Sequence, residues 1–304
     1  MINLRKESGM TSMDALRRLR SLLRVKKTGH CGTLDPSATG VLPVCLGQAT
    51  RLAEYYTGQK KRYRAEATFG VVTDTQDADG TVLRREAPRI TQAEAKDALF
   101  SFVGKIKQIP PMFSAVRHKG QRLYDLARRG EVVERAERET EIYGMEWLAW
   151  TPGLYPRAVF EVACSHGTYI RALCDDLGKR LGCGAHLSAL CRLETGSFYL
   201  EESVGLAEVA ARFAEGDLTF MLPLGWGLDL PALEMPLSRA EAFRRGLPSD
   251  LGRLGAAPLP NGPCAVYCAG ELLGVGRAEA GELRPDKVLR GDGGDGAKKM
   301  IQGG

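Results

Sequence analysis

The sequence has 304 residues, of which 44% are hydrophobic and 26% charged, and its formal net charge is +5. The chain is long enough for one large domain with a sizeable core and a second small one. The absence of an apolar run of about 18 residues excludes a hydrophobic membrane helix, and the N-terminus lacks the apolar core of a signal peptide. We therefore expect a cytoplasmic protein with no membrane partner.

The positive charge is unevenly distributed. Residues 225–304 contain ten Lys or Arg and ten Asp or Glu, so the whole excess of five falls within residues 1–224. This asymmetry points to a polyanionic partner, although a surplus of this size is also common on ordinary solvated surfaces.

The eight cysteines and four histidines show no metal-ligand spacing. No Cys-x-x-Cys pair occurs, and no histidine falls at ligand spacing beside a cysteine. We therefore expect no metal site, and we interpret most of the cysteines as small, buried and reduced side chains.

The first element predicted is a basic helix. Thr11 and Asp14 form a capping-box pattern, and leucines then recur at helical spacing. The exposed positions carry arginines that continue into a lysine pair, so the pattern predicts a helix over residues 12–27. Its basic residues are Arg17, Arg18, Arg20, Arg24, Lys26 and Lys27. A face toward phosphates and a merely solvated face are equally compatible with this pattern.

Residues 29–43 are predicted to form an irregular loop with a defined conformation. Three glycines and two prolines in fifteen residues rule out a regular helix or central strand. The loop's one acid is Asp35, and the ring of Pro36 restricts its backbone toward extended angles. A carboxylate held in this way is a candidate for function, while a simple turn cap explains the same residues equally well.

Residues 62–69 alternate strictly and predict a half-buried antiparallel strand with Tyr63 at its start. The acids and glycine that follow, in residues 75–80, come close to a calcium-loop pattern. We prefer a hairpin turn, because Thr75 occupies the first ligand position and a strand precedes the segment where a helix is required.

Thr91 and Glu94 predict the start of another helix, with Gly104 as its stop. Residues 108–138 then form an irregular insertion with a short helix near Leu123. Between Arg117 and Arg138 there are seven Lys or Arg against four acids. The pattern fits a segment that orders against a nucleic acid, and a solvated charged excursion remains the alternative.

A strand over residues 158–164 leads into a helix that begins near Ile170 and ends at Gly182. Arg171 falls in the first turn, where the helix dipole disfavours an unpaired cation. We therefore expect Arg171 to have an acidic partner, an ordinary surface salt bridge being the alternative.

From about residue 230 the pattern predicts a small β-rich domain, and residues 291–304 are Gly-rich and expected to be disordered.

Residues 29–43 resemble the catalytic loop of the bacterial TruB-type tRNA pseudouridine-55 synthases. Further segments are similar to that family in the same order, namely residues 61–65, 73–77, 109–115, 164–171 and 181–187. The resemblance implies an α+β fold, a mixed and mainly antiparallel sheet with flanking helices. It also implies a catalytic domain over residues 1–228, with the basic insertion, and a PUA-like RNA-binding domain over residues 229–290.

The resemblance implies that the chain isomerises uridine-55 in the T-loop of tRNA to pseudouridine without a cofactor. Asp35 would be the nucleophilic carboxylate, acting on a flipped-out uridine, and Arg171 would keep it ionised and aimed. Tyr63 would stack on the uracil and assist removal of the C5 proton. The remaining contacts would be Leu190 as an apolar wall, Tyr169 as a further contact, and His30 in the space that the base vacates.

The same resemblance implies a grip on the tRNA backbone by the basic helix and the insertion. The residues concerned are Arg17, Arg24, Lys26, Lys27, Arg117, Lys119, Arg122, Arg128 and Arg129. The tRNA T-stem-loop would be the partner of a monomer that needs no other protein.

Three alternatives stay open. A synthase of the same fold could act on another RNA with a guide and protein partners. The chain could instead be an RNA-binding or tRNA-folding module without catalysis. A glycosidase would also use a carboxylate at an anomeric carbon, but it normally needs a second carboxylate, which no motif here supplies.

Overall fold

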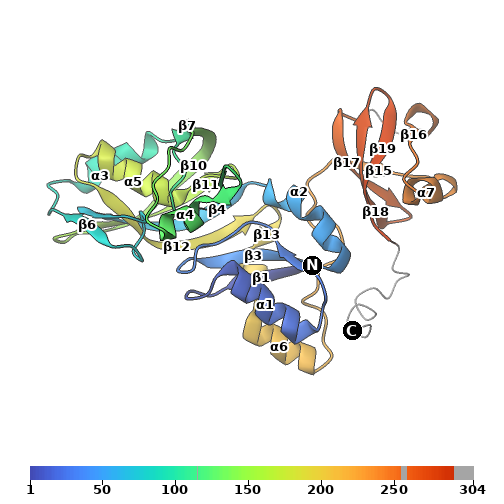
Figure 1. The fold of residues 1–304 in the computed structure, drawn as a ribbon, viewed down its shortest axis with the longest axis horizontal. Coiled ribbons are helices and arrows are strands. Elements are labelled where there is room, and N and C mark those ends of the chain that lie inside the picture. Colours follow the sequence, from blue (N-terminus) through green and yellow to red (C-terminus); the bar gives the residue numbers. More distant parts are fainter. Residues whose placement is uncertain (115, 255–258, 291–304) are drawn as a thin grey trace. The chain divides into compact units, whose positions relative to one another are not determined.

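The computed structural model describes residues 1–114, 116–254 and 259–290, and the fold is drawn in Figure 1. It contains two compact units that each draw on separate parts of the chain. The first holds Met1–Asp35, Val41–Gln59 and the chain from Gly196 onward; the second holds Pro36–Gly40 and Lys60–Thr195. The predicted catalytic loop therefore contributes to both units.

The second unit is built on a mainly antiparallel sheet. Its strands are β4 (Lys61–Phe69), β7 (Gly104–Gln108), β10 (Arg138–Thr151), β11 (Arg157–Cys164) and β12 (Ala185–Thr195). They are ordered β12-β4-β11-β10-β7, and the start of β3 (Thr39–Leu46) pairs in parallel with β12. The alternation predicted for residues 62–69 is confirmed, because every second side chain of β4 is buried.

Two helices accompany this sheet, α3 (Gln92–Phe100) and α5 (Ile170–Arg180). The capping box of Thr91 and Glu94 is confirmed, since each side chain accepts from the other's main-chain N–H. The predicted stop at Gly104 is wrong: α3 ends at Phe100, and Gly104 opens strand β7. The predicted helix after residue 164 is confirmed, with Arg171 in its first turn.

Two excursions leave the sheet. Strands β5 (Val71–Thr73) and β6 (Val82–Arg85) pair antiparallel, which confirms the hairpin. The insertion lies between β7 and β10, and its elements are β8 (Arg117–His118), β9 (Gln121–Arg122) and α4 (Leu123–Arg128). Gln108 and Arg138 are register partners, so the insertion leaves and rejoins the sheet at one point.

The first unit contains the strands β1 (Ile2–Lys6), β2 (Thr28–His30), most of β3, β13 (Phe198–Tyr199) and β14 (Val204–Gly205). Its helices are α1 (Ser12–Leu23), α2 (Ala53–Thr57) and α6 (Leu206–Ala214), with 3-10 turns η1 (Gly47–Leu52) and η2 (Leu200–Glu202). The capping box at Thr11 is confirmed. The helix predicted over residues 12–27 ends earlier, because Arg24 adopts the left-handed conformation with φ 53°.

The C-terminal part of this unit has a five-stranded sheet ordered β15-β17-β18-β19-β16, which confirms the predicted β-rich domain. The elements are β15 (Ala232–Glu234), α7 (Leu237–Arg244), β16 (Ser249–Asp250), η3 (Gly252–Leu254), β17 (Gly262–Cys268), β18 (Glu271–Glu279) and β19 (Glu282–Val288). The tail predicted to be disordered, residues 291–304, falls outside the described residues.

The cysteines are buried apart from half-buried Cys191, as the sequence predicts. Within the described ranges, no helix is both long enough and apolar enough to cross a membrane.

Candidate active site

Asp35 follows a residue whose main chain is held by a side chain of helix α1. The Ser12 hydroxyl accepts from the Leu34 N–H at 2.9 Å and donates to the Leu34 carbonyl at 3.1 Å. Ser12 is 2% exposed and Leu34 is 3% exposed, whereas Asp35 itself is half-buried. Because both bonds are shielded from water, they restrict the backbone immediately before the carboxylate.

The segment after Asp35 is fixed against strand β12 of the second unit. Thr39 pairs with Cys191, and the Thr39 hydroxyl lies 3.4 Å from the Leu190 carbonyl oxygen. Gly40 has φ +105°, and a Cβ placed there would lie 2.2 Å from the carbonyl oxygen of Arg192. Only glycine fits this approach, which explains one of the glycines that the loop contains.

Tyr63 and Leu190 lie on one face of the sheet. The register pairs Leu190 with Ala65, and Tyr63 lies two residues before Ala65 on β4. Since residues two apart in a strand share a face, Tyr63 and Leu190 are diagonal neighbours there. The structure therefore brings together two of the predicted base contacts, one aromatic and one apolar.

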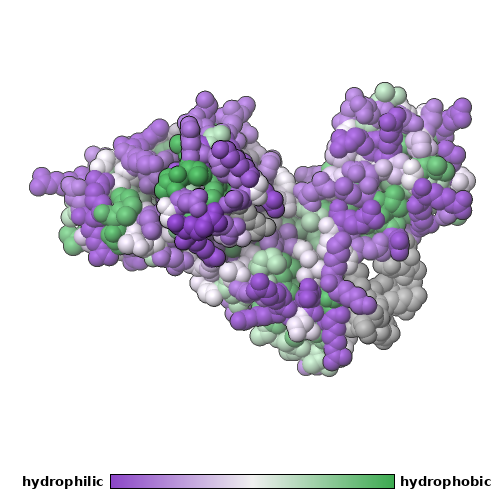
Figure 2. Space-filling view, viewed as in Figure 1, coloured by the Kyte–Doolittle hydropathy of each residue, from purple (hydrophilic) through white to green (hydrophobic). Residues whose placement is uncertain are grey.

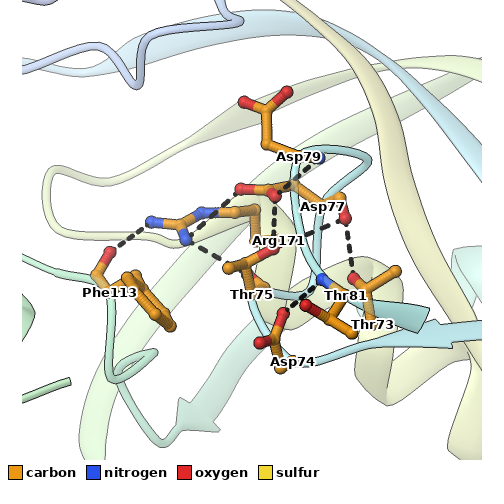
Figure 3. Close-up of polar contacts among 8 residues, drawn as sticks. All are labelled: Thr73, Asp74, Thr75, Asp77, Asp79, Thr81, Phe113 and Arg171. Atoms are coloured by element: carbon orange, nitrogen blue, oxygen red, sulfur yellow. Dashed lines mark hydrogen bonds and ion pairs between the residues drawn. The ribbon is translucent and has the colours of Figure 1, made fainter. Parts of the chain in front are cut away.

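Arg171 is a buried cation whose partners include groups from two different loops, as Figure 3 shows. Its Nη2 donates to the Phe113 carbonyl at 2.7 Å, and its Nη1 donates to the Thr75 carbonyl at 3.1 Å. The same Nη1 lies 3.5 Å from Oδ2 of Asp77. Arg171 is only 5% exposed, so the alternative of an ordinary surface salt bridge is wrong.

Asp77 is the acid that sequence reasoning missed as a partner of Arg171. It lies in the hairpin loop between β5 and β6 and is 8% exposed. Its Oδ1 accepts from the Thr75 hydroxyl and from the Asp79 N–H. The carboxylate is therefore aimed at the guanidinium by its own turn. The sequence did contain a signal for this partner, because the acid-rich turn of residues 73–77 is one of the segments that resemble the family.

The other predicted base contacts lie on different elements. Tyr169 is the N-cap residue of α5 and is half-buried, and no side chain caps the helix at that position. His30 ends strand β2, where it pairs with Val44, and it is also half-buried. No group of His, Cys, Asp and Glu arranged to hold a metal ion is found in the part of the chain that the structure describes.

The basic insertion carries a hollow of about 600 Å³ beside helix α4. It is lined by Arg117, Gly120, Gln121, Tyr124, Asp125, Arg128 and Arg129. The Arg128 guanidinium lies over the Tyr124 ring, 5.5 Å from its centroid. On the face drawn in Figure 2, hydrophilic side chains cover much of the region where Figure 1 shows α4.

The remaining predicted backbone contacts are distributed as follows. Lys119 is exposed, whereas Arg122 lies in β9 and its side chain is outside the description. In the first unit, Arg17 on α1 is exposed and pairs with Asp14. Arg24, Lys26 and Lys27 are exposed beyond the end of that helix.

Comparison with known proteins identifies this arrangement. The model of the TruB family pseudouridylate synthase N-terminal domain matches residues 20–170, and that of the tRNA pseudouridylate synthase B C-terminal domain matches residues 171–224. A relative from Moorella thermoacetica named tRNA pseudouridine synthase B is 43% identical, over 95% of this chain and 98% of that protein. The chain belongs to the TruB family of pseudouridine synthases. A second relative of that name, from Thiobacillus denitrificans, is 42% identical over 94% of each chain.

Solved structures support the same TruB fold. One is an H/ACA RNP bound to a substrate RNA containing 2'-deoxyuridine, with a TM-score of 0.74 and 24% identity over 96% of this chain and 85% of that one. Another is a Cbf5-Nop10-Gar1 complex, with a TM-score of 0.72 and 26% identity over 99% of this chain and 80% of that one. The predicted α+β fold and the enzyme class, an RNA-modifying isomerase, are thereby confirmed.

Proposed function

We propose that this protein isomerises uridine-55 in the T-loop of tRNA to pseudouridine. The observation that carries the proposal is the similarity to relatives named tRNA pseudouridine synthase B over nearly the whole length of both chains. A module that only binds RNA has no need of a buried cation fastened at a helix start, such as Arg171. The alternative without catalysis is therefore not favoured.

The reaction requires one carboxylate that attacks or stabilises the reacting centre, and we assign that role to Asp35. The N-glycosidic bond breaks, the uracil turns, and its C5 bonds to C1′ of the same ribose. C5 then loses its proton, and N1 carries a proton in the product, so the reaction is balanced without a cofactor. A carboxylate in the loop ahead of Gly40 can attack or stabilise the reacting centre while the base is detached.

We assign to Arg171 the task of keeping Asp35 ionised and aimed, because a nearby cation favours the charged carboxylate. The contacts of the guanidinium with Thr75, Phe113 and Asp77 support this role, since they leave it little freedom to reorient. Asp77 would then act through Arg171 as a positioning residue.

A flipped uracil needs a flat and partly apolar site. Tyr63 and Leu190 share one face of the sheet, which supports stacking on Tyr63 with Leu190 as the wall. Tyr63 would also assist removal of the C5 proton, Tyr169 would supply a further contact, and His30 would occupy the space that the base leaves.

The insertion and the basic residues near α1 would contact the tRNA backbone. The exposed cations around the hollow beside α4 support this assignment, and Tyr124 adds an aromatic surface. We further propose that residues 229–290, with their five-stranded sheet, form a PUA-like RNA-binding domain. A monomer that acts in the cytoplasm without a protein partner completes the proposal.

Tritium release from a T-loop RNA labelled at C5 of uridine tests the assignment. We expect release by the wild-type protein and a loss of at least 1,000-fold in Asp35→Asn, because a nucleophile supplies most of the chemistry. Robust release by Asp35→Asn would remove Asp35 from its role. Tight binding of the RNA by wild-type protein without any release would instead favour the binding module.

A further inference from the structure

Gln108 makes a two-bond clamp on the main chain of Tyr169. Its Nε2 donates to the Tyr169 carbonyl at 3.1 Å, and its Oε1 accepts from the Tyr169 N–H at 3.0 Å. The side-chain amide of Gln108 thus pairs with the Tyr169 main chain in the way that the peptide groups of a neighbouring strand would. Gln108 is 2% exposed. Losing both bonds leaves the N–H of half-buried Tyr169 without this partner, while its carbonyl keeps only the 3.1 Å bond from the Leu173 N–H.

The clamped residue starts the helix that carries Arg171. Tyr169 is the N-cap of α5 and its side chain makes no capping bond, so the two Gln108 bonds restrain this helix start from a neighbouring strand. A second clamp lies at the other end of the same turn. There the Ser165 N–H donates to the Glu141 carbonyl at 2.8 Å, and the Ser165 hydroxyl accepts from the Glu141 N–H at 2.9 Å.

Gln108 is also the residue at which the insertion departs from strand β7. Five residues later, the Phe113 carbonyl accepts the 2.7 Å bond from Arg171, which Figure 3 shows on the opposite side of the guanidinium from Asp77. The next carbonyl, of Ser114, accepts from the N–H of Tyr124 in helix α4. A continuous series of bonds therefore joins the basic hollow to Arg171.

We propose that Gln108 is a positioning residue that couples the basic insertion to Arg171. Gln108 fixes the start of α5 against the end of strand β7, where the insertion begins, which we call the root of the insertion. It thereby keeps the Phe113 carbonyl within hydrogen-bond distance of the Arg171 guanidinium. RNA seated on the insertion then acts on the orientation of Arg171 through this root. The inference rests on the proposed catalytic role of Arg171 and adds to it a residue that does not touch the substrate.

The test compares Gln108→Met, which keeps the side-chain length but removes both bonds, with Gln92→Met on the exposed start of α3. We measure the single-turnover rate at saturating T-loop RNA, the Kd for that RNA, and the melting temperature. For Gln108→Met we expect the rate to fall roughly 10- to 100-fold while Kd stays within about threefold, because misplacement of a reacting group costs rate rather than binding. Gln92→Met should match the wild type.

Coupling is tested by adding Arg128→Ala to each protein. We expect this change to slow the wild-type single turnover but to add little to the loss in Gln108→Met, because the connection is already broken. A multiplicative double variant, or a Gln108→Met protein with the wild-type rate, would overturn the proposal. So would a loss confined to Kd or to the melting temperature.

If Gln108→Met does not fold, Gln108→Asn replaces it, since it keeps a neutral amide but is one methylene too short for both bonds, and the same split between rate and Kd is required. An inactive wild type refutes the proposed function. An active wild type that is lost in Asp35→Asn, combined with an unaffected Gln108 variant, refutes only the coupling.

Discussion

The Nη1 of Arg171 lies 3.5 Å from Oδ2 of Asp77, and both residues are less than a tenth exposed. Breaking a buried pair leaves one charge without its counterion, which is costly in a medium of low dielectric constant. We expect Asp77→Asn to lower the single-turnover rate by roughly 10- to 100-fold. We also expect it to lower the free energy of unfolding by about 3 kcal/mol. Rapid-quench tritium release and denaturant unfolding measure the two effects.

The hairpin itself provides the matched control. Asp79 lies two residues away and is exposed, and Figure 3 shows its carboxylate directed away from Arg171. Asp79→Asn should keep the wild-type rate and stability. Equal losses in both variants would mean that the net charge of the turn matters, and not the ion pair.

The Ser12 hydroxyl bonds both main-chain groups of Leu34, so we expect Ser12→Ala to loosen the loop that carries Asp35. The change leaves the buried N–H and carbonyl of Leu34 without their partner, at a cost of about 1–3 kcal/mol in stability or local order. We expect a slower single turnover with little change in the Kd for RNA. Ser21→Ala, exposed on the same helix, should be silent. A Ser12→Ala protein with an unchanged rate would show that the loop is ordered by other contacts.

The insertion predicts a change in salt dependence. Replacing Arg117, Arg128 and Arg129 by alanine should reduce the slope of log K against log salt by about 2–3, because each phosphate contact contributes about 0.7–0.9. Titrations of a T-loop RNA at several salt concentrations measure it. Alanines at three exposed cations outside the insertion, Arg89 before α3, Lys96 on α3 and Lys105 on β7, should leave the slope nearly unchanged. Similar slopes for both triple variants would remove the insertion from the RNA interface.

Burial raises the pKa of the Cys164 thiol to about 11. The folded state therefore holds this proton more tightly than the unfolded state, whose thiol titrates near its ordinary value of about 8.5. The stability that this difference contributes is fully present below about pH 8.5, and it is lost as the pH rises through 11. Cys164→Ala lacks this titration.

Denaturant unfolding of the wild type and Cys164→Ala at pH 8, 9.5 and 11 tests the point. The difference in unfolding free energy between the two should shift by about 2–3 kcal/mol in favour of Cys164→Ala across this range. Parallel pH dependences would contradict a raised pKa at Cys164.

Local sequence rules predicted the elements that depend on near neighbours. The capping boxes at Thr11 and Thr91 join residues three apart, and the alternation in β4 needs only a period of two. The end of α1 escaped prediction because Arg24 takes a left-handed conformation without being glycine or asparagine. A run of basic residues with no stop signal gave no reason to end the helix there.

The contacts around the candidate site join residues far apart in the chain. Asp77 meets Arg171 because a hairpin and a helix start converge, and Gln108 meets Tyr169 because β7 ends beside that start. Neither pairing has a period or a spacing that the sequence could display. The family resemblance supplied Arg171 and Tyr169, whereas the residues that hold them needed three dimensions.

The pairing of Gln108 with Arg138 has an evolutionary consequence. A segment that departs and returns between facing positions of a ladder can lengthen, shorten or be exchanged without shifting the register of the sheet. The part of the insertion beyond Ser114, which we propose to contact RNA, can thus diverge while the Phe113 carbonyl that binds Arg171 is kept. Loops grafted between Ser114 and Arg138 would keep this contact, and such chimaeras would show whether the RNA preference changes while the reaction is retained.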